Sequence, residues 1–459
     1  MITLSEFDGK RVAVLGLARS GLAAIRALLA GGAEILAWDD DEAARAAAGD
    51  LARHDLASID WAGVTALVLS PGIPHSFPQP HPAVVAARAA GVPIIGDIEL
   101  LGRARPNARY VGITGTNGKS TTTALIGHIL ATAGRPLEIG GNLGTPVLSF
   151  APLGQDGTYV LECSSFQLEL IESLAFDVAV LLNITPDHLD RHGDMAGYIA
   201  AKRRIFAGQR PGSVAVVGVD DAICRGLYEE LRRSPARVIP ASAERPVEGG
   251  VYAERGRLID ATAERPITVL DLAQAPRLPG SHNWQNAAAA YAATQAMGIP
   301  PEVITEAIRS FPGLAHRQEL VGMIGGVRYI NDSKATNADA AEKALACYDA
   351  IYWIAGGLPK EGGITSLRPY FGRVRHAYLI GTATEEFAAT LGTSAPLTRC
   401  GDLATATLAA FEAARRDGIS GAVVLLSPAC ASYDQFAHFE ARGDAFRELV
   451  GRLVRGEGV

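Results

Sequence analysis

The stretch VGITGTNGKSTTT, residues 111–123, decides how the centre of this chain folds. Its apolar residues run into Gly115 and Gly118, and Lys119 then opens a helical pattern. This order is typical of a phosphate-binding loop, in which backbone N–H groups and a helix N-terminus face an anion. The full pattern of that loop has glycine where Ile113 stands, so a plain strand-to-helix turn remains open on this motif alone.

The same rhythm of strand and helix continues on both sides of that stretch. Apolar runs such as RVAVLGL (11–17), VTALVLSPG (64–72) and AVVLLSPA (422–429) alternate with alanine-rich amphipathic segments. This alternation predicts an α/β fold built on parallel sheets covered by helices. Residues 249–272 alternate differently, in a way that indicates hairpins.

The places where the rhythm breaks and restarts predict three domains. A transition lies near residue 97, and a restart follows FPGLAHRQEL at about residue 313. We therefore expect domains at 1–97, 98–312 and 313–459. The length of 459 residues suits three domains of ordinary size.

The composition narrows the function classes. A net charge of −7 argues against a general nucleic-acid binder, which would carry a basic patch. The five cysteines form no C-x-x-C pair, so we expect a reduced protein without disulfides or a zinc site. MITLSEFDGK, residues 1–10, lacks a basic region followed by an apolar stretch, so we expect no secretory signal, and no apolar run approaches 18 residues. These features predict a cytoplasmic protein that does not span a membrane.

Polar side chains follow several of the predicted strands, where ligands bind in α/β sheets. Glu162 ends an apolar run, and with the Ser120 hydroxyl it offers the hard oxygens that Mg²⁺ prefers. His188 belongs to a dense cluster, NITPDHLDRHGD, after the next run. Lys202 lies on a helical segment, and by itself it reads as a solvated lysine.

The first predicted strand leads into GLARSG, residues 16–21. This G-x-A-x-x-G pattern, with Asp39 and Asp40 about 20 residues beyond, indicates a dinucleotide-binding turn. A tight turn between strand and helix explains the pattern equally well, because alanine replaces the middle glycine.

Four polar loops follow strands or linkers in the last third of the chain. They read HRQE at 316–319, NDSKATN at 331–337, GGLPKEGG at 356–363 and SPACASYDQFAHFEARG at 427–443. Each is rich in polar residues and either contains glycine or proline or follows a segment that does. Four such loops in one region indicate a second ligand-binding face.

Taken in order, the motifs resemble those of a known family. The matching stretches span the whole chain and read GTNGKSTTT, GGNLG, LECSSFQLE, NITPDHLDRH, AAKRRIF, HNWQNAAAA, HRQE, NDSKATN and SPACASYDQF. Together they resemble the Mur ligases of peptidoglycan synthesis. That family has a shortened phosphate loop, G-T-N-G-K-[ST], so Ile113 is no defect. The last motif resembles the branch that adds D-glutamate to UDP-N-acetylmuramoyl-L-alanine, and the D-N-P-R signature of a diamino-acid branch is absent.

The resemblance implies an ATP-dependent ligase that forms an amide bond through an acyl phosphate. It implies ATP and two Mg²⁺ ions as cofactors, and we expect a monomer. The residues it assigns to ATP are Gly115, Thr116, Asn117, Gly118, Lys119, Ser120, Thr121, Asn283, Arg317, Asp332 and Lys334. Those it assigns to metal binding are Ser120, Glu162, His188 and Lys202, with Lys202 modified to a carbamate. The catalytic residues it implies are Lys119, Glu162, His188 and Lys202. A carbamate converts a cationic side chain into an anionic oxygen ligand.

The resemblance also assigns the two other substrates. The N-terminal domain becomes a UDP-binding rather than an NAD-binding domain, and the C-terminal domain closes over ATP and the amino acid. The residues implied for the UDP-substrate are Arg19, Ser20, Asp39, Asp40, Gly72, Asn142 and Gln167. Those implied for D-glutamate are Thr336, Lys360, Ser432, Tyr433 and Phe439. Tyr433 stands where the family commonly has leucine, and Arg19 is larger than the usual residue.

Two other classes of protein remain open on sequence grounds. One is a different amide ligase of the same fold, such as a folylpolyglutamate synthase or another Mur enzyme, against which the C-terminal loops argue. The other is a non-catalytic nucleotide-binding or dehydrogenase-like protein, which the N-terminal turn would suit. That second reading leaves residues 115–120, His188, Lys202 and the C-terminal loops unexplained.

Overall fold

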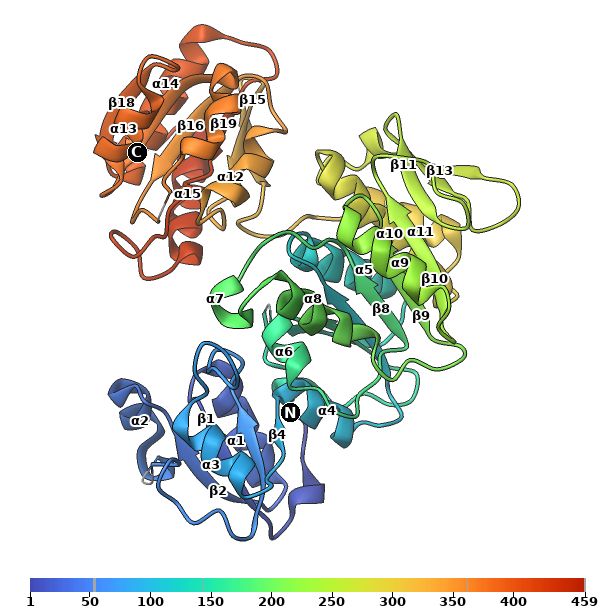
Figure 1. The fold of residues 1–459 in the computed structure, drawn as a ribbon. Coiled ribbons are helices and arrows are strands. Elements are labelled where there is room, and N and C mark those ends of the chain that lie inside the picture. Colours follow the sequence, from blue (N-terminus) through green and yellow to red (C-terminus); the bar gives the residue numbers. More distant parts are fainter. Residues whose placement is uncertain (53–54, 143, 361, 458–459) are drawn as a thin grey trace. The chain divides into compact units, whose positions relative to one another are not determined.

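The computed structural model describes residues 1–52, 55–142, 144–360 and 362–457. Within them the strands form three mostly parallel sheets, each with helices packed against it (Figure 1). This confirms the predicted α/β fold class. No helix of the described chain is both long and apolar enough to cross a bilayer.

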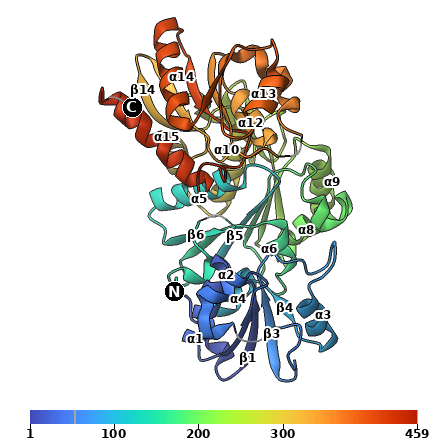
Figure 2. The ribbon, with the colours of Figure 1, turned by 90° about the vertical axis from the view of Figure 1, so that its left-hand side faces the viewer.

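The first sheet has the strand order β2-β1-β3-β4, and every pairing in it is parallel. Alternate residues of β1 point to opposite faces: Val12 and Val14 pack with α1, whereas Ala13 packs with α3. The two helices therefore cover opposite faces of the sheet (Figure 2). The elements of this region are β1 (Arg11–Leu15), α1 (Arg19–Ala30), β2 (Glu34–Trp38), α2 (Glu42–Ala48), β3 (Val64–Leu69), α3 (Pro82–Ala89), β4 (Ile94–Ile95) and α4 (Asp97–Ala104).

The second sheet is the largest, with the order β13-β12-β11-β10-β9-β8-β5-β7-β6. Strands β11, β12 and β13 pair antiparallel, which confirms the hairpin pattern predicted for this segment. Edge strand β6 was missed, because its short run contains two glycines and follows Pro136. The strands are β5 (Arg109–Thr114), β6 (Leu137–Gly141), β7 (Thr158–Glu162), β8 (Val178–Leu181), β9 (Val214–Gly218), β10 (Arg237–Ser242), β11 (Val251–Glu254), β12 (Arg257–Asp260) and β13 (Ile267–Asp271).

Helices surround the second sheet and carry several of the predicted site residues. The most important is α5, which follows β5 directly and is buried along most of its length. The helices are α5 (Lys119–Thr132), α6 (Ser165–Glu169), α7 (Leu189–His192), α8 (Met195–Arg203), α9 (Ala222–Leu231), α10 (Ser281–Ala296) and α11 (Pro301–Ser310).

The third sheet has the order β14-β15-β19-β16-β17-β18, parallel except for the β14–β15 pair. Its central strand β16 is buried throughout, as expected for a parallel strand covered on both faces. The elements are β14 (Glu319–Ile324), β15 (Val327–Asn331), α12 (Ala338–Leu345), β16 (Ile351–Gly356), β17 (Val374–Ile380), α13 (Thr384–Leu391), β18 (Leu397–Gly401), α14 (Leu403–Asp417), β19 (Val423–Leu426) and α15 (Phe439–Val454).

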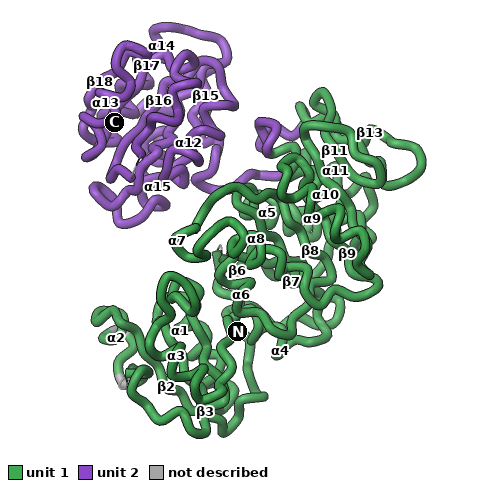
Figure 3. The backbone as a smooth tube through the Cα atoms, viewed as in Figure 1, with its two compact units in different colours: residues 1–274, 283–310 green, residues 275–282, 311–459 purple. Residues whose placement is uncertain are grey.

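The backbone divides into two compact units (Figure 3). One comprises residues 1–274 and 283–310 and holds the first two sheets, and the other comprises residues 275–282 and 311–459 and holds the third. The predicted domain join near 97 falls inside the first unit. The division into three domains therefore stays a prediction.

Candidate active site

The loop between β5 and α5 has the backbone of an anion cradle. Gly115 and Gly118 have φ values of +155° and +84°, which favour glycine. A Cβ on Gly118 would also meet the side-chain oxygen of Asn286, a buried residue that would have to shift. The ammonium of Lys119 donates to the carbonyl oxygens of Gly115 and Thr116, at 2.9 Å each. Its charge is thus held over the loop, where phosphate groups would bind.

Two residues outside the motif brace this loop. Asn183, two residues beyond the end of β8, accepts hydrogen bonds from the backbone N–H groups of Thr116 (2.9 Å) and Asn117 (2.8 Å). The hydroxyl of Tyr198 lies 3.1 Å from the hydroxyl of Thr116. Neither residue was predicted from the sequence. The position of Asn183 at the carboxyl end of a strand was the available signal.

Glu162 supplies a buried carboxylate at the end of β7. The residue is 2% exposed, and its Oε1 accepts a hydrogen bond from the Asn142 amide at 2.8 Å. Its Oε2 is buried without a hydrogen-bond partner among the described residues. An orphaned carboxylate oxygen is unfavourable unless a cation or water completes it, so Glu162 fits the role of a Mg²⁺ ligand. The described residues hold no cluster of three or more His, Cys, Asp or Glu side chains arranged for a metal ion.

Lys202 corrects an expectation from the local sequence. Its helix, α8, turns the side chain inward, so the residue is 2% exposed rather than solvated. Its ammonium donates to the carbonyl oxygen of Gly115 at 2.8 Å and lies 4.6 Å from the centre of the Tyr198 ring. Burial and the nearby charge of Lys119 lower the pKa of Lys202 to about 7. A large share of its amines is therefore neutral near pH 7, the form that can add CO₂.

His188 makes its contacts at the start of α7. It precedes α7 with a φ of +51°, and its side chain is half exposed. Its Nε2 is 3.4 Å from a carboxylate oxygen of Asp187, and its ring centre is 5.1 Å from that of Phe166. In the described chain it forms no hydrogen bond or ion pair with Glu162 or Lys202. Its part in a metal site stays a prediction.

The N-terminal turn shows the close packing that its glycines predict. A Cβ on Gly21 would lie 1.8 Å from the carbonyl oxygen of Gly16, so the helix approaches the strand at this point. Asp39 accepts a hydrogen bond from the Leu17 N–H at 2.7 Å, which places this carboxylate beside the turn. The Arg19 guanidinium, in the first turn of α1, donates to the carbonyl oxygen of Gly144 at 2.6 Å. Arg19 thereby reaches the segment that also holds Asn142.

The remaining residues predicted for the UDP-substrate lie on the same unit. Asp40 accepts from the indole N–H of Trp38 at 3.1 Å and lies 3.0 Å from the ring of His81. Gln167 is only 3% exposed, and it forms a capping box with Ser164 at the start of α6. Ser20 and Gly72 lie in the first turn of α1 and in the loop after β3. Contact of any of them with a substrate stays a prediction.

In the second unit, Asp332 is held at the end of β15. It accepts hydrogen bonds from the Ser427 hydroxyl (2.8 Å) and the Gln318 N–H (3.1 Å). Burial raises its pKa to about 7, against the charge of Arg317 nearby. The ammonium of Lys334 lies 5.9 Å from the centre of the Phe439 ring.

The residues predicted for D-glutamate have very different exposures. Ser432 is 2% exposed, whereas Tyr433 is 71% exposed and Lys360 is also exposed. Thr336 lies in the turn after Lys334, whose carbonyl oxygen accepts its N–H at 2.9 Å.

One buried cation connects these loops. Arg442, on α15, is 1% exposed and donates to Ser333 Oγ (2.9 Å), Ser333 O (2.9 Å), Cys430 O (3.0 Å) and Ala431 O (3.3 Å). Its partners come from the loops at 331–337 and 427–443. Arg442 therefore joins two of the four predicted ligand loops, a role that was not predicted from the sequence.

Comparison with known proteins places this chain in a family. Residues 113–294 match the model of the Mur ligase middle domain. The UDP-N-acetylmuramoylalanine–D-glutamate ligase of Rhodospirillum rubrum is 58% identical, over 99% of this chain and 97% of its own. The protein of the same name from Caulobacter vibrioides is 53% identical, over 100% and 99%. This chain belongs to the Mur ligase family.

Solved structures share the fold of this Mur ligase at low identity. The UDP-N-acetylmuramate–alanine ligase MurC of Thermotoga maritima superposes with a TM-score of 0.58 at 16% identity, covering 97% of this chain and 100% of its own. FolC of E. coli, solved with DHPP and ADP, gives a TM-score of 0.55 at 19% identity, covering 78% and 94%. At these identities the likeness concerns the fold alone.

Asp97 of this Mur ligase allows a test of how burial of a carboxylate changes the stability of the protein with pH. Its Oδ2 is buried without a hydrogen-bond partner among the described residues, and burial raises its pKa to about 6. An unfolded aspartate has a pKa of about 3.9. Between these values the folded state binds the additional proton, so the free energy of unfolding falls as the pH rises through this window.

We expect Asp97→Asn to remove that penalty. It should raise the free energy of unfolding at pH 8 by about 1–3 kcal/mol and change it little at pH 4. Urea unfolding at the two pH values measures the difference, with Asp156→Asn at an exposed position as the matched control. An equal change at both pH values would show that ionisation of Asp97 is not the cause.

Replacing Arg442 is expected to lower the free energy of unfolding of the second unit. Arg442→Met leaves the carbonyl oxygens of Ser333, Cys430 and Ala431 buried without this donor. The Ala431 oxygen keeps the Leu358 N–H as a donor, at 2.9 Å, so two carbonyl oxygens lose a partner. Since each such loss costs about 1–3 kcal/mol, we expect at least about 2 kcal/mol of destabilisation in urea unfolding. Arg416→Met, at an exposed position on α14, is the control. Equal unfolding midpoints for the two variants would contradict the role of Arg442.

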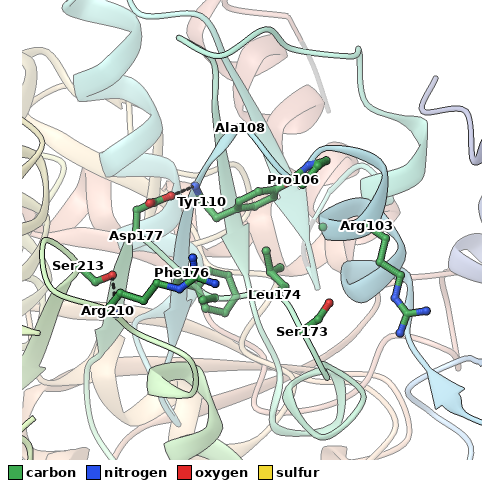
Figure 4. A pocket seen from close by; sticks show the side chains of 12 residues that line it. Arg103, Pro106, Ala108, Tyr110, Ser173, Leu174, Phe176, Asp177, Arg210 and Ser213 are labelled. Carbon is green, nitrogen blue, oxygen red and sulfur yellow. Dashed lines mark hydrogen bonds between the residues drawn. The ribbon is translucent and has the colours of Figure 1, made fainter. Parts of the chain in front are cut away.

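This Mur ligase also has a pocket away from the phosphate loop (Figure 4). It has a volume of about 300 Å³ and lies at the amino ends of β5, β8 and β9. Its wall includes Tyr110, Phe176 and Arg210, and the Asp177 carboxylate accepts from the Tyr110 N–H at 2.8 Å. None of the predicted site residues is among the residues that line it.

Proposed function

We propose that this protein joins D-glutamate to the carboxylate of UDP-N-acetylmuramoyl-L-alanine at the expense of ATP, a step of peptidoglycan precursor synthesis in the cytoplasm. The relatives named UDP-N-acetylmuramoylalanine–D-glutamate ligase align along nearly the whole chain. The arrangement of two buried side chains at the phosphate loop carries the proposal. Lys202 donates a hydrogen bond to Gly115 of the loop. Glu162, whose Oε2 has no hydrogen-bond partner among the described residues, is the last residue of β7, the strand that pairs with β5. This arrangement suits phosphoryl transfer from ATP.

The chemistry begins with a carboxylate, which is a poor electrophile. A carboxylate oxygen attacks the γ-phosphorus of ATP, ADP leaves, and an acyl phosphate forms. The ammonium of Lys119 neutralises charge that builds up on the transferred group, and the loop amides orient it. The neutral amine of D-glutamate then attacks the acyl carbon. The C–N bond forms, the amine gives a proton to a base or to an oxygen of the departing phosphate, and the tetrahedral intermediate expels phosphate.

The metal ligands proposed are Ser120, Glu162, His188 and a carbamate on Lys202, in two Mg²⁺ sites. Bound Mg²⁺ would supply compensation for the negative charge of the phosphate groups. Glu162 supports this assignment, because its free oxygen is a hard donor in a buried place. The Lys202 amine would give up a positive charge and gain two oxygens on reaction with CO₂. An unmodified ammonium in the same place would repel a cation.

The other proposed roles follow the three predicted domains. The first domain binds UDP through Arg19, Asp39 and their neighbours, and the backbone of Gly72, in the loop at 70–73 after β3, contacts the diphosphate of UDP. The middle domain binds ATP, and the third closes over ATP and D-glutamate. Closure shields the acyl phosphate from water and aligns the three substrates. Alignment of reactants can lower an activation barrier by about 7–11 kcal/mol. We propose that the enzyme acts as a monomer.

The test is phosphate release from ATP in the presence of UDP-N-acetylmuramoyl-L-alanine. D-Glutamate, L-glutamate, L-lysine and diaminopimelate are added in turn. Release that depends strictly on D-glutamate is the expected result. Release with another amino acid would keep the amide-ligase mechanism and overturn the substrate. If a folded protein released phosphate with none of these amino acids, the proposed ligase activity would be overturned.

A further inference from the structure

The short helix α7 reaches toward the loop after β3, where the UDP diphosphate is proposed to bind. The Arg191 guanidinium donates to the carbonyl oxygen of Gly72 in that loop, at 2.7 Å. The same guanidinium lies 4.7 Å from the centre of the Phe166 ring on α6, which restricts its orientation. Behind α7, a Cβ on Gly193 would lie 3.7 Å from the Phe77 ring, so the chain after β3 packs along this helix.

His192, the next residue, enters the protein interior. Its side chain is 1% exposed, and its Nε2 lies 2.9 Å from the Ser165 hydroxyl. Its ring stacks on that of Phe166, with 5.2 Å between centres and 15° between planes. Burial lowers the pKa of His192, so the imidazole is neutral and one ring nitrogen must accept a hydrogen bond.

The second ring nitrogen of His192 faces a shared carboxylate. Nδ1 lies 3.6 Å from Oε1 of Glu169, and Nε2 of His75 lies 3.9 Å from Oε2 of the same residue. With the proton on Nδ1, the imidazole points its N–H toward Glu169 and accepts the Ser165 hydroxyl at Nε2. His75 belongs to the same loop as Gly72, so this loop meets α6 and α7 at two places.

The interior contacts continue to the phosphate loop. The ring centre of His192 lies 5.4 Å from that of Tyr198. The Tyr198 hydroxyl reaches Thr116, and its ring lies beneath the Lys202 ammonium. His188, a proposed metal ligand, immediately precedes α7. One helical turn therefore contacts the segments proposed for the UDP diphosphate, the metal and ATP.

We propose that Arg191 and His192 are positioning residues that hold the UDP-diphosphate loop, His188 and the phosphate loop in one arrangement. They act through Gly72, Ser165 and Tyr198 rather than by touching substrate. The inference rests on the proposed function and deepens it. A displacement of about 1 Å among these segments is enough to slow the reaction strongly, because the substrates must be aligned.

The kinetic test uses two variants. His192→Phe keeps the ring stack and removes both nitrogens, and Arg191→Met keeps the stem and removes the donor to Gly72. For each we expect KM for UDP-N-acetylmuramoyl-L-alanine to rise about tenfold and kcat to fall, while KM for D-glutamate changes less than about twofold. His376→Phe, on β17 of the second unit, is the matched control. A lower melting temperature with KM and kcat unchanged would reduce both residues to a packing role.

A second variant pair tests the route. If His192 acts through Ser165, Ser165→Ala should raise the same KM, and Ser165→Ala with His192→Phe should add less than about twofold to the larger single effect. Full additivity would overturn this route. Arg191 is half-buried, so Arg191→Met tests the arrangement even where His192→Phe fails to fold.

Hydrogen exchange separates this inference from the proposed function. In His192→Phe we expect faster exchange at residues 70–75 and 186–192 than in the unsubstituted protein, with no change across β16. Unchanged exchange at both segments would overturn the inference. An unsubstituted protein without ligase activity would overturn the proposed function only, since exchange requires no reaction.

Discussion

Lys202→Ala is expected to reduce substrate-dependent phosphate release about a hundredfold to a thousandfold while the protein stays folded. In the structure the Lys202 amine is buried against Gly115 of the phosphate loop. A carbamate on this amine would supply anionic oxygens there, and alanine can supply none. Steady-state phosphate release with all three substrates measures the loss. Lys10→Ala, at an exposed position before β1, is the matched control.

Small carboxylates provide the second part of this test. Formate or acetate at high concentration is expected to restore part of the activity of Lys202→Ala, because it places oxygens in the space left by the side chain. The Lys10→Ala control should not respond. A folded Lys202→Ala enzyme that neither anion rescues would argue against a carbamate ligand and leave Lys202 as a cation beside the loop.

Lys119→Ala is expected to abolish formation of the acyl phosphate, with phosphate release lowered by at least about a hundredfold to a thousandfold. The reason is the location of its charge, which two loop carbonyl oxygens hold over the place where the phosphates would bind. Single-turnover release of phosphate measures the chemical step, and a separate ATP-binding measurement shows how much affinity is lost. A rate equal to that of the unsubstituted enzyme would remove Lys119 from the reaction.

Lys119→Arg tests whether the charge alone is sufficient. Arginine keeps the positive charge but presents a planar fork instead of a compact ammonium. The loop carbonyl oxygens of Gly115 and Thr116 accept from one nitrogen atom, a geometry that a guanidinium does not reproduce. We expect the arginine variant to recover little of the lost rate. Near-normal activity would show that charge, rather than its placement, is what the reaction needs.

The fold was predictable because its signals are local. The glycine positions around Lys119 and the buried strands such as β16 depend on backbone preference and on short apolar runs. The edge strand β6 was missed for the same reason, since its two glycines weaken the local signal that other strands give clearly.

The candidate site was predictable only in part. The phosphate loop and Glu162 were selected from motif and strand position, and the structure places both at the carboxyl ends of adjacent strands. Local sequence predicts a solvated lysine at position 202, because a lysine on a helix is solvated by default. Its burial is a consequence of packing, which no window of sequence around it contains. Arg442 escaped selection because two of its four acceptors belong to Ser333, which lies 109 residues away in the chain.

By itself, the sequence determined the α/β class, the positions of most strands and the phosphate loop, since these depend on interactions between residues a few positions apart. The tertiary structure decided which polar groups meet and what burial does to them. The hydrogen bond from Lys202 to Gly115 spans 87 residues, and that from Arg442 to Ser333 spans 109. Desolvation at such contacts lowers the pKa of Lys202 to about 7 and raises that of Asp332 to about 7. These shifts depend on what surrounds each group in space, and only the folded chain defines those surroundings.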